Sequence, residues 1–155
     1  MGGRVEENLK RANLELPRPS KPIGLYVSAV KSGNMLFVSG HGPLRPDRSL
    51  VCGRVGEDVS VEQAKEAAKI TALNVLATVN ASLGSLDRVK RVVKVLGLVR
   101  AVPDFTEHPR VIDGFTEVLR TAFGEENGLP ARSAIGVASL PAGICVEVEA
   151  VFECD

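Results

Sequence analysis

Apolar residues recur three or four positions apart between residues 60 and 84, which is the spacing of a helix with one buried face. They are mostly small side chains: Val61, Ala64, Ala68, Ala72, Val75, Val79 and Leu83. Ser60 and Gln63 have the spacing of a capping box, and Gly84 is suited to end the helix. We therefore predict a long helix here that packs closely against a sheet.

A second helical repeat ends at about Phe123. It consists of Val111, Phe115, Val118, Leu119 and Ala122. Pro109 is acceptable in its first turn, and Gly124 is placed to close it. Residues 88–102, between the two helices, are rich in valine and alternate with basic side chains, so they predict a long strand.

Four further β-rich runs lie outside the helices. LYVSAVK and NMLFVSG are separated by Ser32 and Gly33, which predicts a hairpin. ARSAIGV and ICVEVEAVFE flank a Pro- and Gly-containing turn, and they predict a second hairpin at the end of the chain. The long segment after the first hairpin reads as a loop with room for one short strand.

The order β-β-α-β-α-β-β predicts an α+β fold, in which one sheet carries both helices on one face. The other face would be bare, and its strands are apolar enough to need cover, so we expect self-association. Residues 1–22 begin with a charged amphipathic stretch that could form a short helix, and they end in PRPSKP. We treat them as an N-terminal extension, and residues 23–155 as a single domain.

Composition narrows the function classes. The 155 residues are 45% hydrophobic and 25% charged, as in ordinary globular proteins. The 19 basic and 19 acidic side chains cancel, which argues against a nucleic acid or an anionic membrane as the partner. No apolar run approaches the roughly 20 residues of a membrane helix. The three cysteines lack close spacing, and the N-terminus lacks the apolar core of a secretory signal, so we predict a reducing, cytoplasmic or organellar location.

The last β-rich run holds the most suggestive side chains. Strand alternation places Glu147 and Glu149 on one face, and the simplest interpretation is a solvated surface. If hairpin pairing turned Arg132 to the same face, a cation and a carboxylate would share a cavity. Arginine is suited to clamp a substrate carboxylate, and a nearby glutamate could orient water. Spacing alone permits both interpretations. His41 and His108 lie on different elements, so we predict no metal site.

Several segments together resemble the reactive-intermediate deaminase family, also called RidA, YjgF-like or endoribonuclease L-PSP-like. They are FVSGHGPL, the run AAKITALNVLATVNASLGSLDRVKRVVKV, PDF, LPARSAIGVASLP and VEVEA, together with Tyr26. The succession of PARSA and VEVEA carries most of the resemblance, which runs from about Gly24 to Phe152. It implies a chorismate-mutase-like fold and a homotrimer with a central barrel and ligand clefts between subunits.

The resemblance also implies an activity. Relatives with the arginine hydrolyse enamine and imine intermediates such as 2-aminoacrylate to 2-oxo acids and ammonia, and they use no cofactor. By this resemblance Arg132 would hold the carboxylate of a small metabolite, and Glu147 would position the attacking water. The pocket would be lined by Tyr26, Ser39, Gly40 and the backbone of Ala134.

Two positions depart from the family pattern. His41 stands where a glutamine usually follows Ser-Gly, and Pro109 stands where the deaminases often have an asparagine. These departures are typical of a divergent branch with a different substrate. A trimeric protein that binds small molecules without catalysis remains the alternative. We rank an endoribonuclease last, because zero net charge, one tyrosine and no tryptophan provide no platform for stacking bases.

Overall fold

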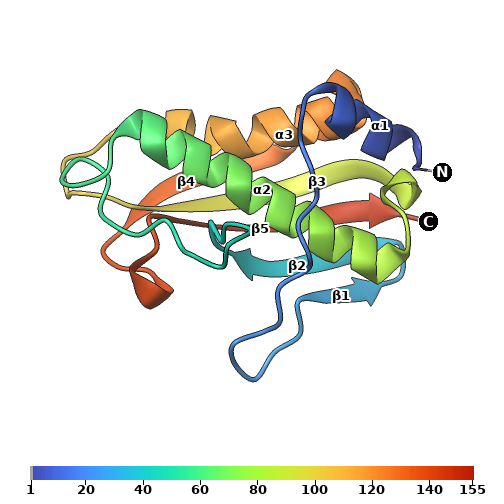
Figure 1. The fold of residues 1–155 in the computed structure, drawn as a ribbon, viewed down its shortest axis with the longest axis horizontal. Helices are drawn as coiled ribbons and strands as arrows, with labels where there is room; N and C mark the ends of the chain where they lie inside the picture. The colour runs from blue at the N-terminus through green and yellow to red at the C-terminus, as the bar shows by residue number, and fades with distance from the viewer. Residues whose placement is uncertain (1) are drawn as a thin grey trace.

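In the computed structural model, which describes residues 2–155, five strands form one sheet. Two long helices, α2 (Val61–Leu83) and α3 (His108–Gly128), pack side by side across one of its faces (Figure 1). In their order across the sheet, the strands are Ala29–Ser32 (β1), Met35–His41 (β2), Val146–Cys154 (β5), Val89–Arg100 (β3) and Ala131–Val137 (β4). Neighbours are antiparallel except for β3 and β4, which are parallel. The predicted α+β fold is confirmed.

Helix α2 begins and ends where the sequence predicted. The Ser60 hydroxyl accepts the backbone N–H of Gln63 at 3.1 Å, and the Gln63 side chain accepts the N–H of Ser60 at 2.9 Å. Gly84 ends the helix with a φ of 82°. Helix α3 runs further than predicted. Gly124 interrupts it with a φ of 86°, and a last turn continues to Gly128.

The first predicted hairpin forms between β1 and β2, although its turn is Gly33-Asn34 and its first strand starts only at Ala29. The second predicted hairpin is wrong, because β4 and β5 do not pair and β3 lies between them. The inward residues of β5 are all buried: Val146, Val148, Ala150 and Phe152. Strand β4 has no buried residue, so the more apolar strand takes the central position and the less apolar one takes the edge.

The two faces of the sheet differ in cover. The face beneath α2 and α3 is the core, whereas Val30, Phe37 and Ile135 on the open face are each about half exposed, at 51%, 49% and 47%. The bare face expected from the sequence is therefore present, while the trimer that would cover it stays a prediction. Within residues 2–155, none of the helices has the length and apolar character needed to cross a bilayer.

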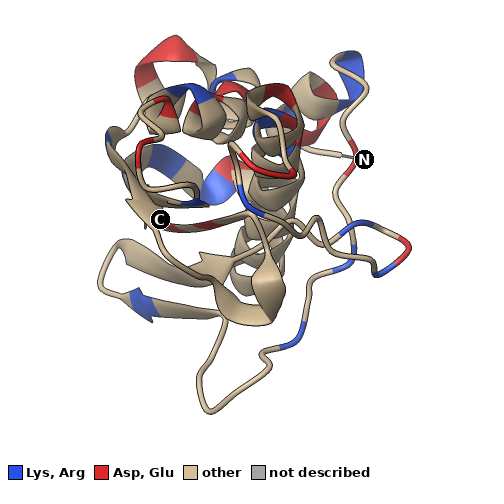
Figure 2. Ribbon diagram, turned by 90° about the vertical axis from the view of Figure 1, so that its left-hand side faces the viewer, with Lys and Arg blue, Asp and Glu red and all other residues tan. Residues whose placement is uncertain are grey.

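The N-terminal segment forms a short helix, α1 (Arg4–Arg11), as the sequence allowed. Val5 and Leu9 of α1 are buried, and the Asp87 carboxylate accepts the N–H groups of Arg4 and Val5 at 2.9 Å each. The chain then crosses α2 and forms a loop below β1 (Figure 1). Figure 2 shows charges of both signs over the helical layer, whereas residues 22–28 of this loop carry none. The boundary between residues 22 and 23 stays a prediction.

Candidate functional site

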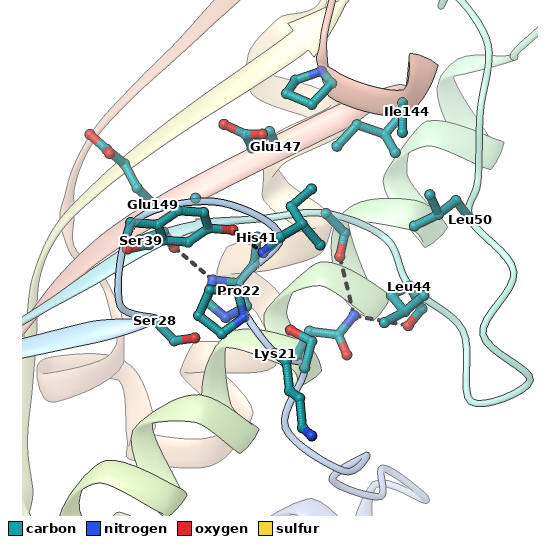
Figure 3. Close-up of a pocket in the computed structure, with 18 of the residues that line it drawn as sticks. Lys21, Pro22, Ser28, Ser39, His41, Leu44, Leu50, Ile144, Glu147 and Glu149 are labelled. Atoms are coloured by element: carbon teal, nitrogen blue, oxygen red, sulfur yellow. Dashed lines mark hydrogen bonds between the residues drawn. The ribbon is translucent and has the colours of Figure 1, made fainter.

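A cavity of about 660 Å³ lies where the loop before β1 approaches β2 and β5 (Figure 3). It is lined by four of the six residues that the sequence singled out, namely Tyr26, Ser39, Gly40 and Glu147. The remaining two, Arg132 and Ala134, lie elsewhere, on β4.

A β-bulge in β2 shapes one wall of the cavity. Ser39 and Gly40 together lie opposite Glu149, because the register of β2 and β5 shifts by one residue at this point. The Ser39 hydroxyl donates to the carbonyl of Val27 at 2.6 Å, which ties the bulge to the loop that carries Tyr26. At Gly40, a methyl group would lie 2.6 Å from Oε2 of Glu147, so the absence of a side chain here leaves this carboxylate in its present position.

His41 links the bulge to α2. Its Nδ1 lies 2.6 Å from the carbonyl oxygen of Ser39, and its Nε2 lies 2.8 Å from the hydroxyl of Thr78 on α2. A carbonyl oxygen can only accept, so Nδ1 carries the proton and the Thr78 hydroxyl donates to Nε2. Burial lowers the pKa of His41, and the backbone contact to Ser39 opposes this shift. The neutral imidazole of His41 therefore holds the bulge in place.

Asn74, one turn before Thr78 on α2, holds the chain that leaves the bulge. Its Nδ2 donates to the carbonyl oxygens of Gly42 and Leu44, at 3.2 and 2.9 Å. The sequence analysis missed Asn74 and Thr78, although polar residues among the apolar buried residues of α2 were a usable signal.

Glu147 is half-buried in the cavity, and its environment disfavours the charged form. Burial is the main cause that raises its pKa, and the neighbouring carboxylate of Glu149 raises it further. Within residues 2–155, no side chain donates a hydrogen bond to Glu147, so its oxygens face the cavity as acceptors. Such a carboxylate can orient a water molecule and accept a proton from it.

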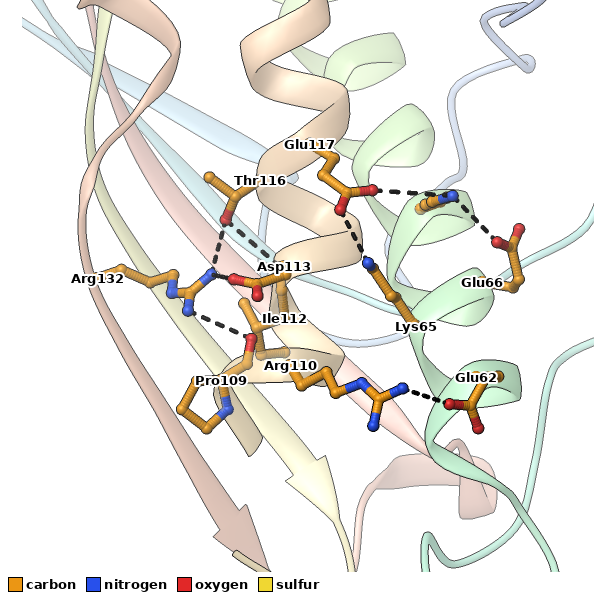
Figure 4. Close-up of polar contacts among 11 residues, drawn as sticks. Glu62, Lys65, Glu66, Pro109, Arg110, Ile112, Asp113, Thr116, Glu117 and Arg132 are labelled. Atoms are coloured by element: carbon orange, nitrogen blue, oxygen red, sulfur yellow. Dashed lines mark hydrogen bonds and ion pairs between the residues drawn. The ribbon is translucent and has the colours of Figure 1, made fainter. Parts of the chain in front are cut away.

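Arg132 lies on the other face of the sheet, where α3 holds it from three points (Figure 4). Its Nη1 donates to Asp113 Oδ1 at 2.8 Å and to the Thr116 hydroxyl at 3.1 Å, and its Nη2 donates to the carbonyl of Pro109 at 3.3 Å. Pro109, which has no polar side chain, thus contributes its backbone instead. The Arg132 side chain remains 20% exposed.

The pairing of Arg132 with Glu147 that the spacing permitted does not form within one chain. Arg132 lies beside Val95, in a row that faces the helices, whereas Glu147 lies beside Leu98, in a row that faces away from them. Strand β3 also separates their two strands. Ala134 shares the helix side with Arg132, because the two residues are two positions apart on β4. In the part of the chain that the structure describes, no three His, Cys, Asp or Glu side chains converge as metal ligands would.

Comparison with known proteins gives consistent matches. The sequence profile of the family described as Endoribonuclease L-PSP matches residues 17–154. Protein TCP17 of Trypanosoma cruzi is 44% identical over 151 residues, which cover 97% of this chain and 94% of that protein. The 2-iminobutanoate/2-iminopropanoate deaminase of Escherichia coli K12 is 34% identical over 134 residues, covering 83% and 87%. Protein Atu1372 of Agrobacterium tumefaciens, described as having unknown function, has a structure similar to this one, with a TM-score of 0.89, 41% identity and coverage of 97% and 94%.

Proposed function

Because the chain belongs to the endoribonuclease L-PSP family, which includes the imine deaminases, we propose that it hydrolyses reactive enamine and imine acids. The products are 2-oxo acids and ammonia, and no cofactor takes part. The observation that carries this proposal is the division of the site. A fixed arginine and an open cavity with a raised-pKa glutamate lie on opposite faces of one sheet, so two copies must supply one cleft.

Arg132 binds the carboxylate of the substrate. Its two Nη1 protons are used by Asp113 and Thr116, and one Nη2 proton is used by Pro109. One N–H on Nε and one on Nη2 remain for the ligand. These donors suit a carboxylate, and the contacts to α3 fix the guanidinium before the substrate arrives. The backbone of Ala134 lines the same half of the cleft.

Glu147 of a neighbouring copy positions the water. The water oxygen forms a bond to the imine carbon, and Glu147 accepts the proton that the water loses. The imine nitrogen takes up a proton from solvent as the water adds, which gives a carbinolamine. The carbinolamine then collapses: Glu147 returns its proton to the nitrogen, the C–N bond breaks and ammonia leaves. The hydroxyl group releases its proton to solvent as the C=O bond of the 2-oxo acid forms. Tyr26, Ser39 and Gly40 line the space in which the reacting carbon lies. An imine is already electrophilic, so orientation supplies much of the acceleration.

A homotrimer brings these halves together. A cyclic assembly uses the same two surfaces in every subunit, which fits a site with one half on β4 and the other half at the cavity. Enclosure of the open face in a central barrel would also bury Val30, Phe37 and Ile135. We place the enzyme in the cytoplasm and its ligand half-sites within a domain spanning residues 23–155.

The test is to generate 2-aminoacrylate in situ with a serine dehydratase and to follow 2-oxo acid formation. Wild-type protein should accelerate this step. Arg132→Ala should lower the rate constant at least ~100-fold, and Arg132→Lys should also lower it, because the lysine loses the planar fork of donors. Gel filtration should show the same assembly for all three proteins. Equal rates for wild type and Arg132→Ala would exclude the assigned role of Arg132.

A small-molecule binding protein that uses the same clefts is the second candidate. It is favoured by the two departures at His41 and Pro109, which change the surroundings of both halves. Saturable binding of a 2-oxo acid, lost in Arg132→Ala and accompanied by no hydrolysis of 2-aminoacrylate, would identify this function.

A further inference from the structure

Two arginines lie side by side at the end of β3, outside the cavity. Val55 forms a parallel bridge with Ala101, and its N–H donates to the carbonyl of Arg100 at 2.8 Å. This register places Arg54 next to Arg100. Val55 and Ala101 are buried in the core, at 0% and 9% exposure. Arg100, the last residue of β3, lies between the buried Val99 and Ala101, so its side chain turns to the opposite side of the sheet. Arg54 precedes the buried Val55, and its side chain is partly buried.

The charges of this pair are not compensated by the protein. Within residues 2–155, neither guanidinium has an acidic side chain within the 4.0 Å of an ion pair. The Nε atoms of Arg54 and Arg100 are shielded from solvent and have no acceptor in the described part of the chain. Among the side-chain nitrogens of the two arginines, only Nη1 of Arg100 donates to an atom of residues 2–155, the carbonyl of Gly143, at 3.3 Å. Asp58 makes no ion pair with either guanidinium within the described residues, and its Oδ1 accepts the backbone N–H of Arg54 at 2.6 Å.

Arg132 shows how this chain holds an arginine that it keeps in place, with three acceptors from its own α3. The pair at the end of β3 lacks such acceptors, although both side chains are partly buried. Like charges on directly adjacent strand residues are destabilising, and a buried donor without an acceptor adds to the cost. One anion placed between the two guanidinium groups would remove both costs.

We propose that Arg54 and Arg100 form a binding site for a small oxyanion of the phosphate class. A phosphate dianion matches the two positive charges, and its oxygens suit the planar forks of two arginines. The site lies behind the wall of the cavity. The carbonyl of Gly143 accepts from Arg100 and also from the N–H of Gly53 at 3.0 Å, while the preceding residue of the same turn, Ala142, lines the cavity. A bound anion would therefore fix the turn that forms this wall.

The experiment measures the melting temperature of the full chain against inorganic phosphate, with ionic strength held constant by sodium chloride. In the wild type we expect a saturable rise of about 3 °C. Arg54→Gln should abolish this rise. It should also fold normally, because the Arg54 side chain donates no hydrogen bond within the described residues. Arg54→Gln/Arg100→Gln should behave in the same way.

Two control variants distinguish phosphate binding at Arg54 and Arg100 from binding at other arginine side chains. Arg120→Gln removes an exposed charge on α3 and should keep the full rise. Arg132→Ala should also keep it, which separates the site from the proposed catalytic cleft. Glycerol phosphate in place of phosphate distinguishes an esterified phosphoryl group from the free ion, and a rise with either supports the proposal. The absence of a saturable rise in the wild type, or an equal rise in Arg54→Gln, would overturn it.

Discussion

The two halves of the proposed cleft are built in opposite ways. Around Arg132 the chain supplies three acceptors, and Asp113, Thr116 and Pro109 leave the guanidinium little freedom. Around Glu147 the chain supplies space, in a cavity of about 660 Å³ that leaves the carboxylate oxygens open. The half with Arg132 offers a fixed cation for the substrate carboxylate. The half with Glu147 offers open space for the water and the reacting carbon.

This difference is the reason why we propose a site shared between two copies of the chain. A carboxylate anchor works best when it is fixed before the ligand binds, and a helix packed on a strand achieves this. A water-activating glutamate needs a partly dry space that a substrate can enter, and the bulge at Ser39 and Gly40 provides it. A single sheet cannot offer both on one face here, because the helices that fix Arg132 cover the face opposite Glu147.

The largest expected effect comes from separating the two halves genetically. Arg132→Ala and Glu147→Gln should each be inactive as pure proteins. When the two variants are co-expressed with different tags and purified as mixed trimers, activity should return, since about one cleft in three then receives both native side chains. The 2-aminoacrylate assay measures the recovery.

A matched control for this experiment is the double variant Arg132→Ala/Glu147→Gln mixed with wild-type chains. The double variant lowers the number of native clefts, and it cannot complete a cleft with a neighbouring subunit because it lacks both Arg132 and Glu147. Mixed assemblies of the two single variants that remain inactive would show that both residues act from one chain, and the proposed arrangement would be abandoned.

The next effect concerns the space around Glu147. Gly40→Ala places a methyl group 2.6 Å from Oε2 of Glu147, so the carboxylate must move. Displacement of a reacting group by this order of distance should lower kcat by about 100-fold, with a smaller change in KM. Ser32→Ala, at an exposed position of β1 that does not line the cavity, serves as the control. A Gly40→Ala protein with wild-type kcat would show that Glu147 does not act on the water.

A smaller effect is expected at the support beneath the bulge. His41→Asn can retain the donor to Ser39 but cannot reach Thr78, and kcat should fall by about threefold to tenfold.

The burial of His41 also makes the free energy of unfolding depend on pH. Because the pKa of His41 is lowered on folding from the ordinary value of 6.5, its contribution to stability is present above pH 6.5 and is lost as pH falls toward the folded pKa. His41→Asn should therefore lose less stability than wild type between pH 7.5 and 5.5, as measured by urea unfolding. Parallel losses would contradict the buried neutral state.

The smallest effect should come from Glu149→Gln. Glu149 is the lesser of the two causes that raise the pKa of Glu147, and burial is the greater. Removing its charge should lower the pKa of Glu147, so the acid limb of the pH profile of kcat should move slightly toward lower pH. Glu153→Gln, further along β5, provides the matched control. An acid limb that stays in place would mean that another group controls it.

Features fixed by neighbouring residues could be predicted from the sequence. The ends of α2 depend on Ser60, Gln63 and Gly84, and each acts on backbone within a few positions. The first hairpin was found for the same reason, with a one-residue error in the turn. The second hairpin failed because its strands compete with β3 for a central place, and the outcome depends on how much apolar surface each strand buries.

The residues of the site differ in the same way, between those that the sequence could identify and those that depend on distant parts of the chain. Tyr26, Ser39, Gly40 and Glu147 were identified by resemblance, and they do line one cavity. The contact of His41 with Thr78 joins residues 37 positions apart, and the anchor of Arg132 on Asp113 spans 19. No local pattern specifies such pairs, because they depend on which strand each helix covers.

The half-exposed side chains of the open face, Val30, Phe37 and Ile135, have a practical consequence for every assay of this protein. If copies cover these side chains for one another, subunit association is coupled to folding, and dilution weakens both. The melting temperature should then rise with protein concentration. Specific activity should fall at nanomolar enzyme, where a low rate would measure dissociation rather than chemistry.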